Sequence, residues 1–254
     1  MEYAACKVPA APVRKKDSHK SEMVNQLLFG ETMIVLKQKK KWARIKSIPD
    51  NYEGWITVSH LEEIEGSLAM LYDPWVTSDL LCPIEIGDKL MYISAGASLL
   101  GLDGTKGKFG TMEYRFSGNK IKRNDIIPDA DTVKKISAQW LNAPYLWGGR
   151  TPLGVDCSGF AKNIFKLLGI DLPRDAWQQA QEGKRIKKLK DALTGDLAFF
   201  NDKDEIVHVG LLLNSEQIIH AAGKVRIDTI TKKGIINSDT GKRTHRLRAI
   251  RRYW

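Results

Sequence analysis

Cys157 is the residue of this chain whose type and position point most directly to chemistry. It follows Asp156, a residue type that caps helix N-termini, and it precedes an apolar run of helical spacing that ends at Gly169. This pattern predicts that Cys157 lies in the first turn of a helix, where unpaired N–H groups and the helix dipole favour the thiolate. The sequence thus indicates a nucleophilic cysteine, with a small buried cysteine at a helix start as the alternative.

Two histidines further along the chain supply partners for such a nucleophile. His208 and His220 lie in apolar, β-branched segments that are separated by the turn residues Asn214 and Ser215. A hairpin closing there would bring the two imidazoles together. A cysteine nucleophile needs a base, and the base needs an orienting group. We therefore expect Cys157 as nucleophile, His208 as base and His220 as orienting residue, against the alternative of two ordinary core histidines.

The segments around these three residues resemble the NlpC/P60 family of cell-wall cysteine peptidases. The resemblance covers about residues 130–254 and implies an α+β, papain-like domain, with a helix, the cysteine helix and then an antiparallel sheet. The segments that carry it, in chain order, are Pro144–Gly149, Asp156–Phe160, Gly195–Phe200, His208–Gly210 and Ile219–Ala221.

The chain ahead of this segment divides into two β-rich units. From Glu22 to Leu61, short alternating runs with Trp42 and Gly54–Ile56 resemble a bacterial SH3 domain. Met70–Ile127 has similar short runs without the Gly-Trp pair, and we interpret it as a divergent SH3-like barrel. The expected domains are an N-terminal arm (1–17), SH3-like barrel 1 (18–66), SH3-like barrel 2 (67–128) and the NlpC/P60 catalytic domain (129–254).

The resemblance also implies residues that surround the nucleophile. Tyr145 matches a family tyrosine, and we expect it to assist an oxyanion hole built on the backbone N–H of Cys157. Asp156 and Ser158 flank Cys157, and in the related enzymes such residues line the substrate pocket. A role as simple helix caps would explain both equally well.

Two SH3-like units ahead of an NlpC/P60 domain resemble the YkfC-like subgroup of the family. The resemblance implies cleavage between γ-D-glutamate and a diamino acid in stem peptides that carry a free N-terminal L-alanine, with barrel 1 contacting the alanine ammonium. A carboxylate and a phenol suit that contact, so Glu22 and Tyr52 are candidates, with Asp175 as a further acceptor. The subgroup often has a serine after this aspartate, where the present chain has Ala176.

These residues lead to one main hypothesis and two alternatives. The hypothesis is a cysteine endopeptidase that hydrolyses the γ-D-glutamyl-L-diamino acid bond of peptidoglycan-derived peptides during muropeptide recycling, without metal or other cofactor. The alternatives are a wall hydrolase anchored to intact peptidoglycan by its SH3 modules and a non-enzymatic wall-binding adaptor. Lysine and diaminopimelate both remain open as the diamino acid.

The composition of the chain indicates which classes of partner are not expected. The net charge of +10 is spread over several basic runs without a nucleic-acid-binding motif, so we expect no nucleic acid partner. No apolar run reaches the roughly 20 residues that span a bilayer, so no membrane partner is expected. Cys6, Cys82 and Cys157 form neither a disulfide framework nor a zinc set. We expect a monomer, cytoplasmic if the chain is complete and periplasmic or envelope-bound if a leader was removed.

Overall fold

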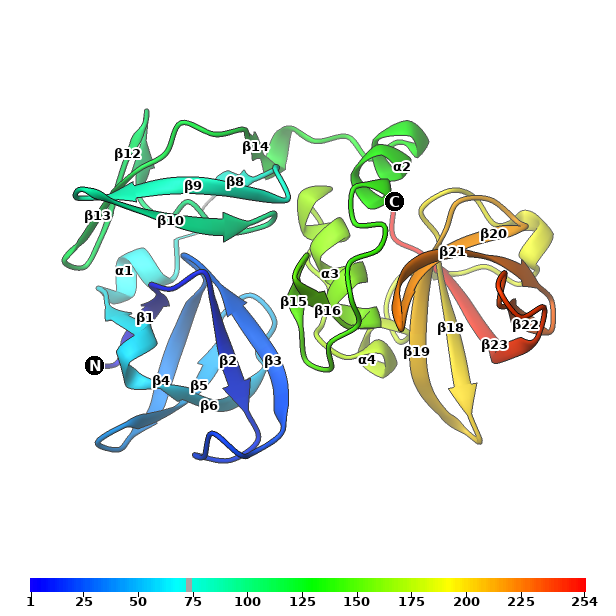
Figure 1. Ribbon diagram of the computed structural model, residues 1–254, viewed down its shortest axis with the longest axis horizontal. Helices are drawn as coiled ribbons and strands as arrows, with labels where there is room; N and C mark the ends of the chain where they lie inside the picture. Colours follow the sequence, from blue (N-terminus) through cyan, green and yellow to red (C-terminus); the bar gives the residue numbers. More distant parts are fainter. Residues whose placement is uncertain (72–74) are drawn as a thin grey trace.

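The first antiparallel sheet begins at the N-terminus and contains seven strands (Figure 1). The computed structural model describes residues 1–71 and 75–254. The strands are β1 (Tyr3–Cys6), β2 (Ala10–Arg14), β3 (Met23–Leu28), β4 (Thr32–Gln38), β5 (Trp42–Ser47), β6 (Glu53–Thr57) and β7 (Leu61–Glu63), with a short 3-10 helix (Val58–His60) before β7. Their order in the sheet is β3-β2-β6-β5-β4-β1-β7.

Residues 1–17 are part of this sheet rather than the separate arm expected from the sequence. Strand β1 pairs with β4 and β7, and β2 pairs with β3 and β6. Ala4, Cys6 and Ala11 are fully buried in the core of the sheet. Short segments built largely from alanine have a weak strand signal, because alanine is depleted in strands. Strands β1 and β2 therefore depend on pairing with neighbouring strands more than on the strand propensity of their own residues.

The second β-rich unit packs directly against the first sheet. Residues 72–74 of the expected barrel 2 lie outside the described residues. The ring of Phe29 contacts those of Phe109 and Tyr114, at centroid distances of 5.4 and 5.3 Å, so the two units share an apolar core. The elements are α1 (Gly66–Ala69), β8 (Trp75–Thr77), β9 (Leu81–Ile86), β10 (Lys89–Ser94), β11 (Leu102–Asp103), β12 (Lys106–Phe109), β13 (Met112–Arg115), β14 (Lys120–Lys122) and a 3-10 helix (Arg123–Asp125).

The C-terminal domain combines short helices with a closed barrel. Its helices are α2 (Ala130–Ala138), α3 (Cys157–Leu167), α4 (Ala176–Gln179) and a 3-10 helix (Leu189–Asp191). Its strands are β15 (Arg150–Thr151), β16 (Gly154–Val155), β17 (Lys184–Arg185), β18 (Leu197–Asp202), β19 (Glu205–Leu212), β20 (Gln217–Ala222), β21 (Lys224–Thr231), β22 (Gly234–Ile236) and β23 (Arg243–Arg252). Strands β23-β18-β19-β20-β21-β22 run side by side, and pairing of β22 with β23 closes them into a six-stranded barrel. The α+β class is confirmed, and the antiparallel sheet expected from the sequence is closed into a barrel.

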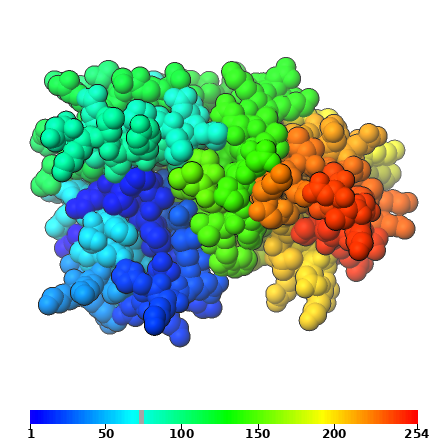
Figure 2. Space-filling view, in the orientation of Figure 1, coloured from blue at the N-terminus to red at the C-terminus, as the bar shows by residue number. Residues whose placement is uncertain are grey.

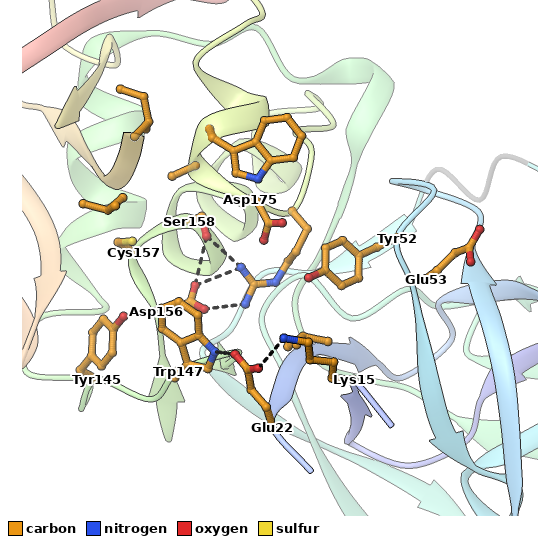
Figure 3. A pocket seen from close by; sticks show the side chains of 16 residues that line it. Lys15, Glu22, Tyr52, Glu53, Tyr145, Trp147, Asp156, Cys157, Ser158 and Asp175 are labelled. Carbon is orange, nitrogen blue, oxygen red and sulfur yellow. Dashed lines mark hydrogen bonds and ion pairs between the residues drawn. The ribbon is translucent and has the colours of Figure 1, made fainter. Parts of the chain in front are cut away.

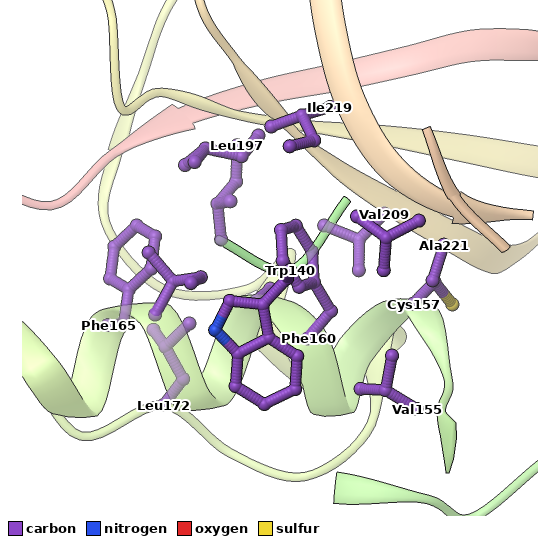
Figure 4. Packing of buried hydrophobic residues seen from close by; sticks show 14 of the residues in the cluster. Trp140, Val155, Cys157, Phe160, Phe165, Leu172, Leu197, Val209, Ile219 and Ala221 are labelled. Carbon is purple, nitrogen blue, oxygen red and sulfur yellow. The ribbon is translucent and has the colours of Figure 1, made fainter. Parts of the chain in front are cut away.

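Helix α3 lies between the N-terminal units and the barrel. Every residue of α3 is buried, which is unusual for a helix in a chain of this size. Its apolar face packs against the outside of the barrel, where Phe160 shares a cluster with Val209 and Ile219 (Figure 4). The space-filling view shows the segment around α3, in green, filling the middle of the molecule (Figure 2). The residue that begins α3 therefore lies where the barrel and the first sheet approach each other.

Candidate active site

Cys157 begins α3 and lies at the edge of the barrel. The carboxylate of Asp156 caps the helix by accepting a hydrogen bond from the backbone N–H of Gly159 at 2.7 Å. A Cβ atom at Gly159 would lie only 2.3 Å from the carbonyl oxygen of Gly149, so glycine is required for the preceding loop to pack against the helix. The cap and the position of Cys157 in the first turn agree with the sequence-based prediction.

The environment of Cys157 keeps its thiol protonated. Burial raises the pKa of the Cys157 thiol to about 12, and the neighbouring Asp156 carboxylate acts in the same direction. The backbone of Val209 and of Ser158 lowers this pKa, but by less than burial raises it. The helix start was expected to favour the thiolate, and burial outweighs that effect. For this sulfur to act as a nucleophile, a base would have to take its proton.

His208 and His220 meet where two strands of the barrel diverge. Strands β19 and β20 form the predicted hairpin, and they pair only through two residues on each strand, next to the turn. Beyond that pairing, His208 Nε2 lies 2.8 Å from His220 Nδ1. A Cβ atom at Gly210 would lie 2.8 Å from the Cβ of His220, so the glycine leaves room for the second imidazole. The proximity of the two histidines is confirmed.

A buried carboxylate continues this series of contacts. Asp228 on β21 places Oδ2 at 3.0 Å from His220 Nε2. Its Oδ1 accepts hydrogen bonds from the Arg226 guanidinium at 2.9 and 3.0 Å and from the backbone N–H of Ser238 at 2.9 Å. Burial opposes ionisation, but hydrogen bonds from His220, Ser238 and Arg226 outweigh it and hold the pKa of the Asp228 carboxyl well below its usual range. Asp228 is thus a carboxylate at neutral pH.

The carboxylate of Asp228 assigns the tautomers of both histidines. Because a carboxylate can only accept, His220 donates from Nε2, and its Nδ1 is the acceptor. His208 then donates from Nε2 to His220 and keeps Nδ1 unprotonated. The free Nδ1 is the nitrogen that can receive a thiol proton.

A third histidine covers the face of His208. The rings of His208 and His245, which lies on β23, are stacked with centroids 4.2 Å apart and an interplanar angle of 24°. Burial lowers the pKa of His245 to about 4. Burial and the neighbouring imidazoles of His220 and His245 lower the pKa of His208 well below 6.5. His208 and His245 are therefore uncharged at neutral pH, and the stacked ring limits rotation of His208.

A cavity of about 660 Å³, here called the Cys157 pocket, opens beside Cys157 (Figure 3). It is lined by both the first sheet and the C-terminal domain. Figure 3 shows the hydroxyl of Tyr145 directed toward Cys157. The six residues predicted from the sequence to bind substrate or to assist the oxyanion all line this pocket: Glu22, Tyr52, Tyr145, Asp156, Ser158 and Asp175.

Arg174 organises the wall of the Cys157 pocket and was missed in the sequence analysis. Its guanidinium donates to both carboxylate oxygens of Asp156, at 3.1 and 2.6 Å, and to Ser158 Oγ at 2.8 Å. Its Nε donates to Asn25 Oδ1 on β3 at 2.8 Å. The Asp156 carboxylate also accepts from the backbone N–H of Gly148 at 2.8 Å. The Asp156 carboxylate is thus fully engaged by the helix start, by the Gly148 loop and by Arg174. We infer that Asp156 positions the wall of the pocket.

Acidic and phenolic groups gather at the end of the pocket formed by the first sheet. Glu22 Oε1 accepts from Trp147 Nε1 at 2.9 Å, and Oε2 lies 3.5 Å from Lys15 Nζ. Burial and the nearby Asp175 carboxylate raise the pKa of Tyr52 to about 12, so its phenol stays protonated. Burial also raises the pKa of Asp175. A partly enclosed group of acceptors of this kind suits a cation.

A buried network of charges fixes the first sheet against α3. Glu31 accepts two hydrogen bonds from Arg150 at 2.8 Å each and one from Lys166 at 2.7 Å. Asp50 lies 3.2 Å from Lys162 Nζ in a second buried pair. The cations of Arg150 and Lys166 outweigh burial and hold the pKa of Glu31 well below its usual range. These contacts fix Glu22 and Tyr52 in place relative to Cys157.

Two further properties concern the part of the chain that the structure describes. No group of three or more His, Cys, Asp or Glu side chains there is arranged to hold a metal ion. No helix within residues 1–71 and 75–254 combines the length and apolar character that a membrane span requires.

Two segments of the chain match known protein families. Residues 142–244 match the NlpC/P60 family, and residues 13–61 match the bacterial dipeptidyl-peptidase SH3 domain. The first segment contains Cys157, His208 and His220, and the second contains Glu22 and Tyr52. The family patterns thus cover the two parts of the chain that meet at the Cys157 pocket.

Individual relatives and a solved structure are also similar to this chain. The chain is 30% identical over 227 residues to the gamma-D-glutamyl-L-lysine dipeptidyl-peptidase of Bacillus subtilis (strain 168), covering 82% of this chain and 76% of that protein. It is 36% identical over 117 residues to the murein DD-endopeptidase MepS/murein LD-carboxypeptidase of Escherichia coli (strain K12), covering 44% of this chain and 62% of that one. The crystal structure of an NlpC/P60 family protein from Bacillus cereus ATCC 10987 has a TM-score of 0.80 at 21% identity, with 99% of both chains covered, and therefore shares the fold.

Proposed function

The chain belongs to the NlpC/P60 family of cysteine peptidases, and on this premise we propose that Cys157, His208 and His220 form its catalytic set. The hydrogen-bonded series Asp228–His220–His208 is the observation that carries this proposal. It leaves His208 Nδ1 as the free acceptor, while burial and the neighbouring imidazoles keep His208 neutral. A nucleophile whose thiol is protonated at rest requires such a base.

The reaction follows from these roles. His208 Nδ1 takes the thiol proton while Cys157 Sγ attacks the carbonyl carbon of the scissile amide. The backbone N–H of Cys157 and the Tyr145 hydroxyl stabilise the oxyanion. His208 then protonates the leaving amine, and the acyl-enzyme thioester remains on Cys157. Water activated by His208 hydrolyses the thioester and restores the thiol.

The proposed substrate is a stem peptide that carries a free N-terminal L-alanine, cleaved between γ-D-glutamate and the diamino acid. The relative from Bacillus subtilis bears the name of a gamma-D-glutamyl-L-lysine dipeptidyl-peptidase. In the present chain, Glu22, Tyr52 and Asp175 line the same pocket as Cys157. Their acceptors suit the alanine ammonium, while an acylated amine would bring no charge and added bulk.

The two N-terminal units have separate roles in this proposal. The first, residues 1–66, supplies the wall of the Cys157 pocket that selects a free amine. The second, residues 67–128, supports the first through the shared core around Phe29. Peptidoglycan-derived muropeptides are then the partners, and a role in recycling would place the enzyme with free muropeptides in the cytoplasm.

Product analysis by mass spectrometry tests this function. L-Ala-γ-D-Glu-diaminopimelate and intact sacculi are each incubated with wild type, Cys157→Ala and, as a matched control, Cys82→Ala, which removes a buried cysteine outside the pocket. We expect wild type and Cys82→Ala to release L-Ala-γ-D-Glu from the free peptide, and Cys157→Ala to release none. If wild type instead released fragments from sacculi and left the free peptide intact, the recycling role would be overturned. That result would favour a hydrolase that acts on the intact wall.

A further inference from the structure

A second cavity adjoins the Cys157 pocket and is lined only by residues of the C-terminal domain. Its volume is about 700 Å³. Trp177 and Ile206 line both cavities, so the two spaces meet at these side chains. The Cys157 pocket receives residues from the first sheet, whereas this second space, here called the arginine cavity, receives none.

The arginine cavity carries an unusual set of charges. Arg185, Arg248 and Arg251 line it together with Asp204 and Glu205. Arg251 is held in place because its Nε donates to the carbonyl oxygen of Ala180 at 2.7 Å. Within residues 1–71 and 75–254, the guanidinium groups of Arg185 and Arg248 have no carboxylate within ion-pairing distance. Two arginines are thus available for an anionic ligand beside the active site.

The positive charge extends beyond this cavity. Arg185 and Arg248 also line a third cavity of about 480 Å³. Four lysines line that cavity as well: Lys187, Lys188, Lys190 and Lys232. Because the two cavities share Arg185 and Arg248, these lysines add to the positive field near the arginine cavity, which favours carboxylates there.

We propose that the arginine cavity binds the diamino acid on the leaving side of the scissile bond and selects one that carries a second carboxylate, such as diaminopimelate, over lysine. The inference rests on the proposed function, because the acyl side of the substrate then occupies the Cys157 pocket. The leaving amine then takes the arginine cavity, which joins that pocket at Trp177 and Ile206.

The chemistry of the two diamino acids supports this choice. The side chain of lysine ends in an ammonium group. Asp204 and Glu205 would suffice to bind this group, and the nearby arginines would repel it. The side chain of diaminopimelate ends in both an ammonium and a carboxylate, which match an acid and an arginine together. Discrimination then comes from an attractive contact for one ligand and a repulsive one for the other.

The test compares three substrates with three proteins. The substrates are L-Ala-γ-D-Glu joined to diaminopimelate, to diaminopimelate with its side-chain carboxyl amidated, and to lysine. The proteins are wild type, Arg185→Gln/Arg248→Gln, and Lys89→Gln/Lys106→Gln, a control that removes the same charge from exposed lysines of the second β-rich unit. For wild type we expect kcat/KM to fall about tenfold on amidation and by at least as much for lysine.

The substrate ratios decide the outcome. In Arg185→Gln/Arg248→Gln the ratio between the acid and its amide should fall to about twofold or less, while the lysine control pair keeps the wild-type ratio. Equal ratios in all three proteins, with cleavage still at the γ-D-glutamyl bond, would overturn this proposal alone. Failure of wild type to cleave any of the three peptides would overturn the proposed function, and this proposal with it.

A product-inhibition measurement gives a second readout. Free diaminopimelate should inhibit cleavage of a common substrate at a several-fold lower concentration than free lysine, and Arg185→Gln/Arg248→Gln should lose this difference. Equal inhibition by both diamino acids in wild type would contradict a carboxylate-selective cavity.

Discussion

The Nε2 atom of His220 lies 3.0 Å from Oδ2 of Asp228, and this contact determines which nitrogen of His208 is free to accept a proton. A neutral histidine as the third residue of a catalytic set gives an imidazolium less electrostatic support than a carboxylate does. In this chain the carboxylate is that of Asp228, which contacts the far nitrogen of the His220 imidazole. The contact between His208 Nε2 and His220 Nδ1 connects His208 to this carboxylate through His220.

Replacing Asp228 by asparagine tests this relay. An asparagine amide in the same place can donate to His220 Nε2 and so favour the tautomer with the proton on Nδ1. His220 could then no longer accept from His208, and the base would lose its orientation. We expect kcat to fall about 100-fold or more with KM little changed, measured by steady-state kinetics.

A neighbouring carboxylate provides the matched control for Asp228→Asn. Asp239 accepts a hydrogen bond from Arg226 at 2.7 Å, as Asp228 also does, but its side chain is 71% exposed and no contact joins it to His220. Asp239→Asn should therefore keep the wild-type kcat. Equal losses in the two variants would show that the effect passes through Arg226 and not through the histidines.

The stacked ring of His245 gives a second prediction. His245→Phe keeps an aromatic ring over His208, and because His245 is uncharged at neutral pH, kcat there should stay close to that of wild type. His245→Ala opens that face of His208 and should lower kcat about two- to tenfold, in line with the energy of an aromatic pair. Equal losses in both variants would instead point to a role that needs the imidazole itself.

The pH dependence of kcat/KM follows from the state of His208. The base must be unprotonated, and burial with its imidazole neighbours lowers its pKa well below 6.5. Activity is then lost only as the pH falls through that lowered pKa, so the acid limb of kcat/KM should lie below pH 6.5. Its midpoint is measured in buffers of constant ionic strength, and a midpoint at or above 6.5 would contradict the buried, neutral base.

The ion network around Glu31 predicts a large loss of stability. Glu31→Gln leaves the cations of Arg150 and Lys166 buried without a counter-charge, which should lower the free energy of unfolding by about 3–5 kcal/mol. Urea unfolding measures the change. Glu113→Gln, which breaks the exposed pair with Lys108, is the control and should leave the midpoint unchanged. Equal midpoints for the two variants would contradict a structural role for Glu31.

The sequence predicted the parts of the site that have local signals. Asp156 before an apolar helical run predicted the start of α3, and the turn at Asn214 predicted the hairpin that joins the two histidines. Each of these signals lies within a few residues of the feature that it predicts. The family resemblance supplied Tyr145, Glu22 and the other residues now seen around the pocket.

The features of the site that the sequence did not predict depend on contacts between segments that are distant in the chain. Asp228 contacts His220, and His245 contacts His208, from strands whose sequences carry no motif; their neighbours are fixed by the register of the barrel. Arg174 was missed because its partners Asp156 and Asn25 are 18 and 149 residues away. The protonation of Cys157 likewise depends on how deeply the folded chain buries it. The acidic Asp228, two positions before Ile230 in a largely apolar and β-branched strand, was the available signal.

The proposed selectivity of the first sheet for peptides with a free amine is tested most directly by one comparison. We would measure kcat/KM for L-Ala-γ-D-Glu-diaminopimelate and for its N-acetyl form, with wild type, Glu22→Gln and the control Glu53→Gln. Glu53 lines the same pocket but is paired with Arg44. We predict that wild type and Glu53→Gln prefer the free amine by at least about 100-fold and that Glu22→Gln loses most of this preference. Equal cleavage of both peptides by wild type would contradict the account.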